Sequence, residues 1–138
     1  MTVKTEDRSA ILDLLARYCW LVDEGDADGW VALWTKDGKF IGGGPQPQEG
    51  HDQLRQTPLG FYAMGGGKLR HVFTNIVVDA GKTADEATAK GYMAVYDFRP
   101  EAAGKTMVFI RSTYTFVRQG GAWKIKNLIA DPLYVNMG

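Results

Sequence analysis

The sequence holds two histidines, and histidine is the side chain that most often transfers protons near neutral pH. His51 lies in a polar stretch and is typical of an exposed helix start. His71 lies in the run Leu-Arg-His-Val-Phe-Thr-Asn, where the alternation of a strand would place His71, Phe73 and Asn75 on one face. Histidine and asparagine beside phenylalanine are unusual in a plain core, although a strand histidine is also often structural. On sequence alone, the two interpretations of His71 carry similar weight.

Tyr18 and Asp23 are further candidates for chemistry, and both lie on a stretch with helical periodicity. Tyr18 falls on the apolar face of that helix, where a tyrosine is either a core residue or a hydrogen-bond donor to a partner. Asp23 falls at the end of the helix, where an acid is slightly unfavourable against the helix dipole. This local conflict is a weak indication that Asp23 has another role.

Metal and nucleotide sites are not favoured by the sequence. The lone Cys19 excludes an internal disulfide and a cysteine-based zinc site, and the two histidines lie far apart without an acidic cluster of ligand spacing. The tract of three glycines before Lys68 is followed by Leu69, where a phosphate-binding loop needs Ser or Thr, and then by a strand instead of a helix. We therefore expect neither a metal nor a cofactor.

Charge and composition narrow the classes of partner. The chain has 16 basic and 16 acidic side chains, so it lacks the positive charge of a nucleic-acid binder or of a polybasic membrane module. Hydrophobic residues make up 45% of the sequence, which is typical of one globular domain over residues 1–138. No apolar run is long enough for a signal peptide core or a membrane span, so we expect a cytoplasmic protein.

The elements that must position these residues change in kind along the chain. Apolar residues at three- and four-residue steps predict a helix that begins near Thr5 and stops at Gly25. A short second helix from Asp26, a short strand and a third helix over residues 50–56 follow, and Pro58 is expected to break or kink the third helix. Four β-rich segments then cover residues 69–79, 87–98, 105–118 and 122–133. Helices followed by strands on short connections predict an α+β domain with helices on one face of a bent antiparallel sheet.

Both faces of the expected strands carry apolar residues, so we expect a second layer of cover on the sheet. Met107, Phe109, Val95 and Ile125 are expected to leave apolar surface outside the domain. A second copy of the chain would cover this surface, which predicts a homodimer through the sheet.

Three segments resemble the SnoaL-like proteins of the nuclear transport factor two superfamily. The run over residues 17–34 resembles their opening, a helix with a tyrosine followed by Asp-x-Gly-Asp and a small aromatic helix. The run Arg-His-Val-Phe-Thr-Asn over residues 70–75 is similar to their Arg-His-x-x-x-Asn strand. The closing strands, with Gly-Gly-Ala-Trp-Lys-Ile over residues 120–125, also match, so the resemblance covers nearly the whole chain.

The resemblance implies a cone-shaped domain, with N-terminal helices packed in the concave face of a curved antiparallel sheet. An apolar cavity opens at one end of such a cone. Ketosteroid isomerase, scytalone dehydratase and SnoaL-type polyketide cyclases share this architecture. Enzymes of the group usually use no cofactor or metal, move protons on small aromatic or polycyclic molecules, and often pair as dimers.

The resemblance carries over unevenly at single residues. Tyr18 falls where ketosteroid isomerase keeps its oxyanion-hole tyrosine, but Gly42 and Ser112 fall where that enzyme has its two acids, so ketosteroid isomerisation is not expected. Asp23 and His71 fall where scytalone dehydratase has an active-site aspartate and histidine, and Ser112 falls at its asparagine. A second active-site histidine of that enzyme has no counterpart here, so the likeness does not extend to scytalone as substrate.

These residues and the resemblance together predict a cofactor-independent lyase, dehydratase or isomerase that acts on a small hydroxylated aromatic or polyketide-like molecule. His71 would be the general acid or base, Asp23 would orient its imidazole, and Tyr18 would donate a hydrogen bond to a developing oxyanion. The residues expected to contact the substrate are Ser112, Trp34, Phe40, Tyr62, Phe73, Asn75 and Tyr96. The alternative is a non-catalytic small-ligand-binding or dimerisation module of the same fold.

Overall fold

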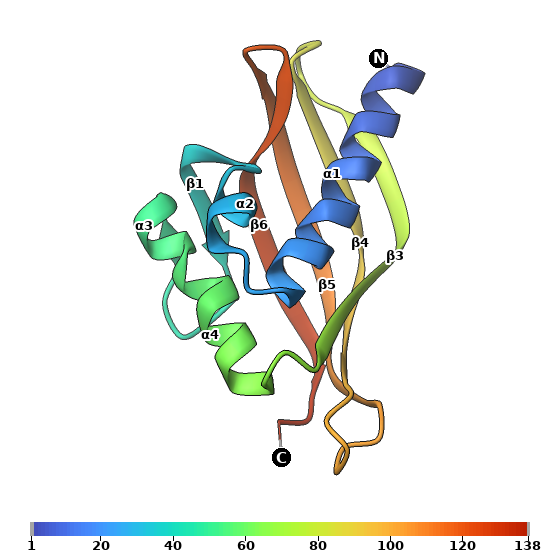
Figure 1. The fold of residues 1–138 in the computed structure, drawn as a ribbon. Coiled ribbons are helices and arrows are strands. Elements are labelled where there is room, and N and C mark those ends of the chain that lie inside the picture. The colour runs from blue at the N-terminus through green and yellow to red at the C-terminus, as the bar shows by residue number, and fades with distance from the viewer. Residues whose placement is uncertain (1, 138) are drawn as a thin grey trace.

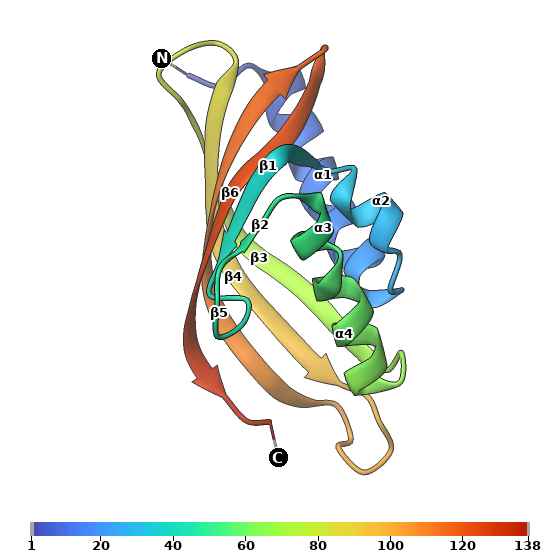
Figure 2. The same ribbon diagram turned by 90° about the vertical axis from the view of Figure 1, so that its left-hand side faces the viewer.

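The computed structural model describes residues 2–137 and places the helices on one side of a curved sheet (Figures 1 and 2). Among these residues, no helix is both long and apolar enough to cross a bilayer. The helices are α1 (Thr5–Asp23), α2 (Ala27–Val31), α3 (His51–Leu54) and α4 (Gln56–Gly65). The strands are β1 (Trp34–Ile41), β2 (Gln48–Glu49), β3 (Leu69–Ala80), β4 (Glu86–Asp97), β5 (Lys105–Gln119) and β6 (Ala122–Val135).

The six strands form one open sheet in the order β2-β1-β6-β5-β4-β3. The four long strands β3 to β6 pair antiparallel, as their short connections predict, and the α+β class with helices against a curved sheet is confirmed. The sheet is mixed, however, because β1 runs parallel to β6. No hairpin joins these two strands, so their connection does not force an antiparallel pairing.

Helix α1 lies across the concave face and supplies much of the core. Its face with Ile11, Leu15 and Val22 is almost completely buried, and it packs toward Tyr114 and Phe116 of β5. Burial of one such aliphatic side chain stabilises the fold by about 1.5–3 kcal/mol. This packing fixes the helix along the sheet, so its last turn lies close to the start of β3.

The first turn of α1 is held by a cluster of charges around Arg118. The guanidinium of Arg118 lies 2.7 Å from Asp7 of the helix and 2.9 Å from Asp85, and it stacks 4.7 Å above the ring of Trp123. Half-buried ion pairs that share one arginine hold their geometry better than isolated surface pairs. The cluster therefore fixes the end of α1 that lies far from His71.

Helix α4 was not expected from the sequence, because Pro58 was predicted to break or kink the helix before it. Pro58 instead lies in the first turn of α4, where a backbone N–H has no partner within the helix and proline is tolerated. Gly66 ends the helix in the left-handed conformation with φ 58°. The result is a further helix that packs beside α1 and lies at the lower end of the fold in Figure 1.

Strand β3 does not alternate regularly, and this changes the place of Asn75. The register with β4 shifts between Thr74 and Val77, and Asn75 adopts φ 56°. Asparagine tolerates this left-handed region better than most residues. Because the bulge adds a residue, Ile76 packs against the core and Asn75 becomes exposed, contrary to the expected common face with His71.

The expected outer apolar surface is wrong for three of its four residues. Val95, Met107 and Ile125 are at most 3% exposed and lie on the concave side, and only Phe109 faces outward. Val95 belongs to the buried alternate positions of β4, and Ile125 pairs with the buried Phe116. Met107 is the extra residue where the β4–β5 register shifts, so simple alternation assigned it to the wrong face.

Candidate active site

The last turn of α1 and the first residues of β3 bring Asp23 and His71 into contact. The ring Nδ1 of His71 lies 2.7 Å from Oδ1 of Asp23. The backbone N–H of His71 also donates to the same carboxylate, at 3.1 Å to Oδ1 and 2.9 Å to Oδ2. The two residues are 48 positions apart in the sequence, so only the packing of α1 along β3 joins them.

The carboxylate determines which nitrogen of His71 is available. An ionised carboxylate only accepts hydrogen bonds, so Nδ1 of His71 carries the hydrogen in this contact. In the neutral imidazole, Nε2 is then an acceptor and can take a proton from another molecule. The exposed fractions of the side chains, 11% for His71 and 8% for Asp23, keep most water away from the pair.

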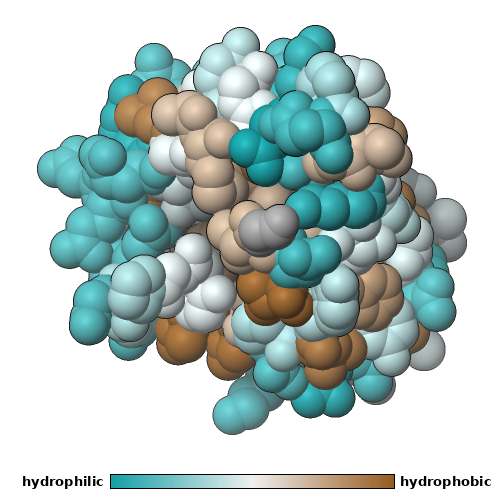
Figure 3. All heavy atoms as spheres, turned by 90° about the horizontal axis from the view of Figure 1, so that it is seen from below, coloured by the Kyte–Doolittle hydropathy of each residue, from teal (hydrophilic) through white to brown (hydrophobic). Residues whose placement is uncertain are grey.

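His71 borders a cavity of about 370 Å³, a volume in the range of small-molecule sites. The cavity lies between α4, the loop over residues 42–44 and the C-terminal part of β6, and Figure 3 looks onto this end of the molecule, where apolar and hydrophilic surface are interspersed. Among residues 2–137, no Asp, Glu, Lys or Arg lines it. The lining residues are Tyr18, Phe40, Gly42, Gly43, Gly44, Thr57, Phe61, Met64, His71, Val95, Met107, Val108, Ile110, Ala130, Pro132, Val135 and Met137.

Tyr18 is the second polar side chain of chemical interest at the cavity wall. Its ring meets the ring of His71 edge-on, with centroids 6.4 Å apart, and packs against Trp30 at 5.3 Å. Burial raises the pKa of Tyr18 well above its ordinary value, and the nearby Cys19 and Asp23 add to this effect. Tyr18 therefore stays protonated and can donate a hydrogen bond to a bound oxygen.

Phe61 of α4 covers His71, and sequence reasoning missed this residue. The centroids of the two rings lie 4.6 Å apart with the planes tilted by 55°. Phe61 and Met64 extend from α4 to the cavity wall. Since α4 itself was not expected, no local signal in the sequence pointed to either residue.

Cys19 follows Tyr18 on α1 but is not available as a nucleophile. Its side chain is buried, and Sγ lies 3.9 Å from Sδ of Met93. Burial and, to a smaller extent, the charge of Asp23 raise the pKa of the Cys19 thiol to about 12. The thiolate is the reactive form, so the structure makes Cys19 a core residue.

Of the seven expected substrate contacts, only Phe40 lines the cavity. Trp34 lies behind it and stacks on Phe40, with centroids 6.0 Å apart and planes 23° from parallel. Ser112 is buried on the concave side, between Gly91 and Ala130. Trp34 therefore supports the cavity wall from behind, while Ser112 belongs to the buried face of β5.

The other four expected contacts lie elsewhere. Tyr62 is exposed and packs against the turn at Gly25, and Tyr96 lies on the outer face beside Phe98. Phe73 packs against the ring of Tyr114 in the core, and Asn75 is exposed at the bulge of β3. Tyr96 faces outward because side chains alternate between the two faces along β4. Asn75 lies away from the cavity because of the bulge in β3.

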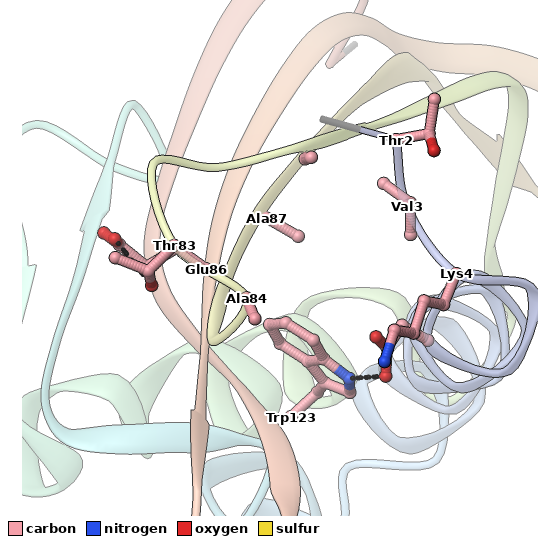
Figure 4. Close-up of a pocket in the computed structure, with 10 residues that line it drawn as sticks. Thr2, Val3, Lys4, Thr83, Ala84, Glu86, Ala87 and Trp123 are labelled. Atoms are coloured by element: carbon pink, nitrogen blue, oxygen red, sulfur yellow. Dashed lines mark hydrogen bonds between the residues drawn. The ribbon is translucent and has the colours of Figure 1, made fainter.

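A second, smaller hollow lies at the opposite end of the sheet, beside the start of α1 (Figure 4). Its volume is about 90 Å³, and Trp123 borders it while donating a hydrogen bond from Nε1 to Asp7 at 3.3 Å. No histidine, cysteine or tyrosine lines this hollow within the described chain. Residues 2–137 also contain no cluster of three or more His, Cys, Asp or Glu side chains that could hold a metal ion.

Solved structures with the same fold include three from Novosphingobium aromaticivorans. An NTF2-like protein with a cystatin-like fold is 25% identical, with a TM-score of 0.83 over 93% of this chain and 82% of that one. A provisionally named aromatic ring hydroxylase is 26% identical, with a TM-score of 0.72 over 95% and 92%. A provisionally named scytalone dehydratase is 19% identical, with a TM-score of 0.76 over 92% and 84%, and this likeness concerns the fold alone.

No functionally curated protein matches the chain significantly. The sequence pattern of the SnoaL-like domain matches residues 3–129, which is nearly the whole chain and includes Tyr18, Asp23 and His71. This match agrees with the fold, in which N-terminal helices pack on a curved sheet, and with the resemblance in the sequence. The chain therefore belongs to the SnoaL-like domain family.

Proposed function

We propose that this protein is a cofactor-independent lyase or isomerase that uses acid–base catalysis on a small hydroxylated aromatic or polyketide-like molecule. The observation that carries the proposal is the 2.7 Å contact between Asp23 and His71 at the wall of an apolar cavity. The SnoaL-like family includes polyketide cyclases and dehydratases, which fits this class of reaction.

His71 is the proton-transfer group in the proposed reaction. In a dehydration, Nε2 of His71 removes a proton from the carbon next to the one that bears the hydroxyl. The electron pair of the broken C–H bond forms a carbon–carbon double bond as the C–O bond breaks. The imidazolium returns the proton to the departing hydroxide, and water leaves. An isomerisation uses the same first step and returns the proton to another carbon.

Tyr18 and Asp23 assist this transfer in different ways. Tyr18 donates a hydrogen bond to the substrate oxygen on which negative charge develops, and the apolar surroundings strengthen that bond. Asp23 holds the imidazole in one orientation and one tautomer and offsets the positive charge that His71 acquires. Because the cavity lining is mostly apolar, the ring system of the substrate fills most of the cavity volume.

The test is a screen of hydroxylated aromatic compounds with purified protein, followed by ultraviolet absorbance because a new conjugated double bond absorbs there. Replacing His71→Ala or His71→Gln is expected to lower kcat by about 10²–10⁴-fold while the melting temperature stays close to that of the parent protein. His51→Gln is the matched control, since His51 lies in α3 and its ring contacts the carbonyl of Trp34 at 3.2 Å. Full turnover in a stable His71→Ala protein would end the assignment of His71.

A further inference from the structure

Tyr114 carries a buried hydroxyl that the proposed mechanism does not use. Among residues 2–137, the Tyr114 side chain is 0% exposed, and its hydroxyl oxygen lacks a hydrogen-bond partner. The other two such atoms are the indole nitrogens of Trp30 and Trp34, which can only donate. A buried hydroxyl without a partner costs stability, so its presence on β5 calls for a reason.

Two polar side chains, those of Tyr18 and Cys19, lie near Tyr114. The Cys19 thiol is a weak hydrogen-bonding group that already lies beside Sδ of Met93. The ring of Tyr114 stacks on Phe116 at 5.7 Å and meets Phe73 edge-on at 5.5 Å, so two sides are apolar. On a third side, its ring meets that of Tyr18 at 5.7 Å and 90°. Tyr114 does not border the cavity, whereas Tyr18 does.

The two tyrosines are close enough for each to affect the ionisation of the other. Burial raises the pKa of Tyr114 well above its ordinary value, and the adjacent Tyr18 and Cys19 add to this effect. The two hydroxyls also lie near enough for a hydrogen-bonding contribution that raises the pKa of Tyr114 and lowers that of Tyr18, although no hydrogen bond of ordinary geometry joins them. Both hydroxyls therefore keep their hydrogens and remain donors. A phenol oxygen can also accept a hydrogen bond while it donates one, so Tyr18 has an open acceptor position for Tyr114.

We propose that Tyr114 is a positioning residue whose hydroxyl donates to the Tyr18 hydroxyl when Tyr18 donates to an oxyanion in the cavity. The inference rests on the proposed function, because it takes Tyr18 as the group that meets the substrate oxygen. A hydrogen bond accepted by a phenol polarises its O–H bond and strengthens its donation to the next acceptor. The buried Tyr114 hydroxyl thus gains its partner in the charged complex, where stabilisation favours reaction.

The chemistry of the ligand follows from this arrangement. Two phenols in series favour an oxygen that carries full or developing negative charge, such as an enolate or a phenolate, over an ether or an alcohol. The probes are para-nitrophenolate, which bears such an oxygen, and para-nitroanisole, which has the same ring and no acidic hydroxyl. Their dissociation constants are measured at a pH where para-nitrophenol is ionised, so the test does not depend on turnover.

Tyr114→Phe is expected to weaken binding of para-nitrophenolate by about 3- to 10-fold, the range of one net hydrogen bond, and to leave para-nitroanisole unchanged. Tyr18→Phe is expected to weaken the phenolate by about 10-fold or more, since a hydrogen bond to a charged oxygen is stronger. The double variant should match Tyr18→Phe alone, because Tyr114 acts through Tyr18. Tyr96→Phe, on the outer face, is the control and should change neither probe.

Stability separates this role from a structural one. Tyr114→Phe removes a buried hydroxyl that lacks a partner, so its melting temperature should equal or exceed that of the parent protein. A clearly lower melting temperature, or an equal loss of affinity for both probes, would overturn the role of Tyr114. If Tyr18→Phe weakens the phenolate while Tyr114→Phe does not, only the inference on Tyr114 is wrong. If Tyr18→Phe has no effect, the oxyanion role of Tyr18 in the proposed function is wrong as well, and Tyr114 loses its partner.

Discussion

The carboxylate of Asp23 accepts hydrogen bonds from both the main chain and the ring of His71. The main-chain bond fixes the strand against the end of α1, and the ring bond selects the tautomer. Two functions in one carboxylate explain why an acid lies at a helix end that disfavours negative charge. They also allow a substitution that separates the two functions.

Asp23→Asn is expected to preserve the main-chain bond and to reverse the tautomer of His71. The amide oxygen still accepts from the backbone N–H, while its NH₂ group donates to Nδ1, so the ring hydrogen moves to Nε2. The ¹⁵N NMR signals of the His71 imidazole show directly which ring nitrogen carries the hydrogen. We expect kcat to fall by at least about 10²-fold with a melting temperature near that of the parent, because Nε2, the proposed base, would carry a hydrogen in place of its lone pair. Identical nitrogen spectra in the two proteins would show that the carboxylate does not select the tautomer, and Asp13→Asn at the exposed face of α1 serves as control.

The contacts of single residues were predictable only where the resemblance reached them. Asp23, His71 and Tyr18 lie in segments whose resemblance to SnoaL-like proteins is visible in the sequence, and the structure brings all three to one place. Phe61 could not be predicted, because its place at His71 depends on the packing of α4. Tyr96 was placed at the site because it is aromatic, whereas its strand position faces outward.

At the scale of elements, the long strands were predictable and the irregular elements were not. Residues 69–79 were expected as a strand, and β3 spans Leu69–Ala80, because β-branched and aromatic residues dominate this segment. The bulge at Asn75 has no comparable signal, and it reverses the facing of the residues that follow. Helix α4 contains Pro58 and Gly60, both weak helix formers, so its formation depends on tertiary packing more than on local preference.

The end of β4 offers a test of an interaction inside one hairpin. The Asp97 side chain is buried and accepts hydrogen bonds from Arg99, the closest at 2.6 Å from Nη2 to Oδ2. These bonds with the Arg99 side chain lower the pKa of Asp97 to about 2. Because the folded pKa lies below the unfolded value, near 3.9, the contribution to stability is present above about pH 4 and is lost as the pH falls toward about 2.

Asp97→Asn is therefore expected to lower the melting temperature at neutral pH, since the partly exposed Arg99 guanidinium loses the buried carboxylate that it pairs with. The difference between the two proteins should shrink as the pH falls from about 4 to about 2, where the parent protein also loses the charge. Thermal unfolding followed by circular dichroism at several pH values measures this. A difference that stays constant down to about pH 2 would contradict the role of the charge.

The whole molecule has one end that is fixed and one end that carries the cavity. Arg118 ties the start of α1 to β5 and to the β3–β4 turn at one end, where the charged cluster and Trp123 lie. The other end gathers α4, the loop over residues 42–44 and the end of β6 around the cavity. The helix that carries Tyr18 and Asp23 is thus anchored far from the site, which keeps its last turn in register with β3.

The outer face of the sheet carries a row of residues that a second copy of the chain could cover. Val72, Ala94, Phe109 and Tyr134 are direct neighbours across β3, β4, β5 and β6, so their side chains share this face. Tyr92 stacks on Phe109 at 5.4 Å. Val72, Tyr92 and Tyr134 are exposed, whereas the small Ala94 between its neighbours is buried. Exposed apolar patches of this kind are typical of interfaces, and we expect a homodimer that buries this face.

Phe109→Lys is the sharpest test of that dimer, because it places a charge in the middle of the row. Light scattering after size exclusion should give twice the mass of the chain for the parent protein and the mass of one chain for the variant, since a desolvated lysine opposite its own copy is strongly unfavourable. Trp20→Lys is the matched control: Trp20 is 70% exposed on α1, on the helical side of the molecule, and its replacement should leave the dimer intact. A monomeric parent protein would exclude the dimer, and a Trp20→Lys variant that alone becomes monomeric would move the interface to the helical side. Either outcome would leave the row from Val72 to Tyr134 without a second copy to cover it, because pairing through the sheet requires both copies to contribute the same face.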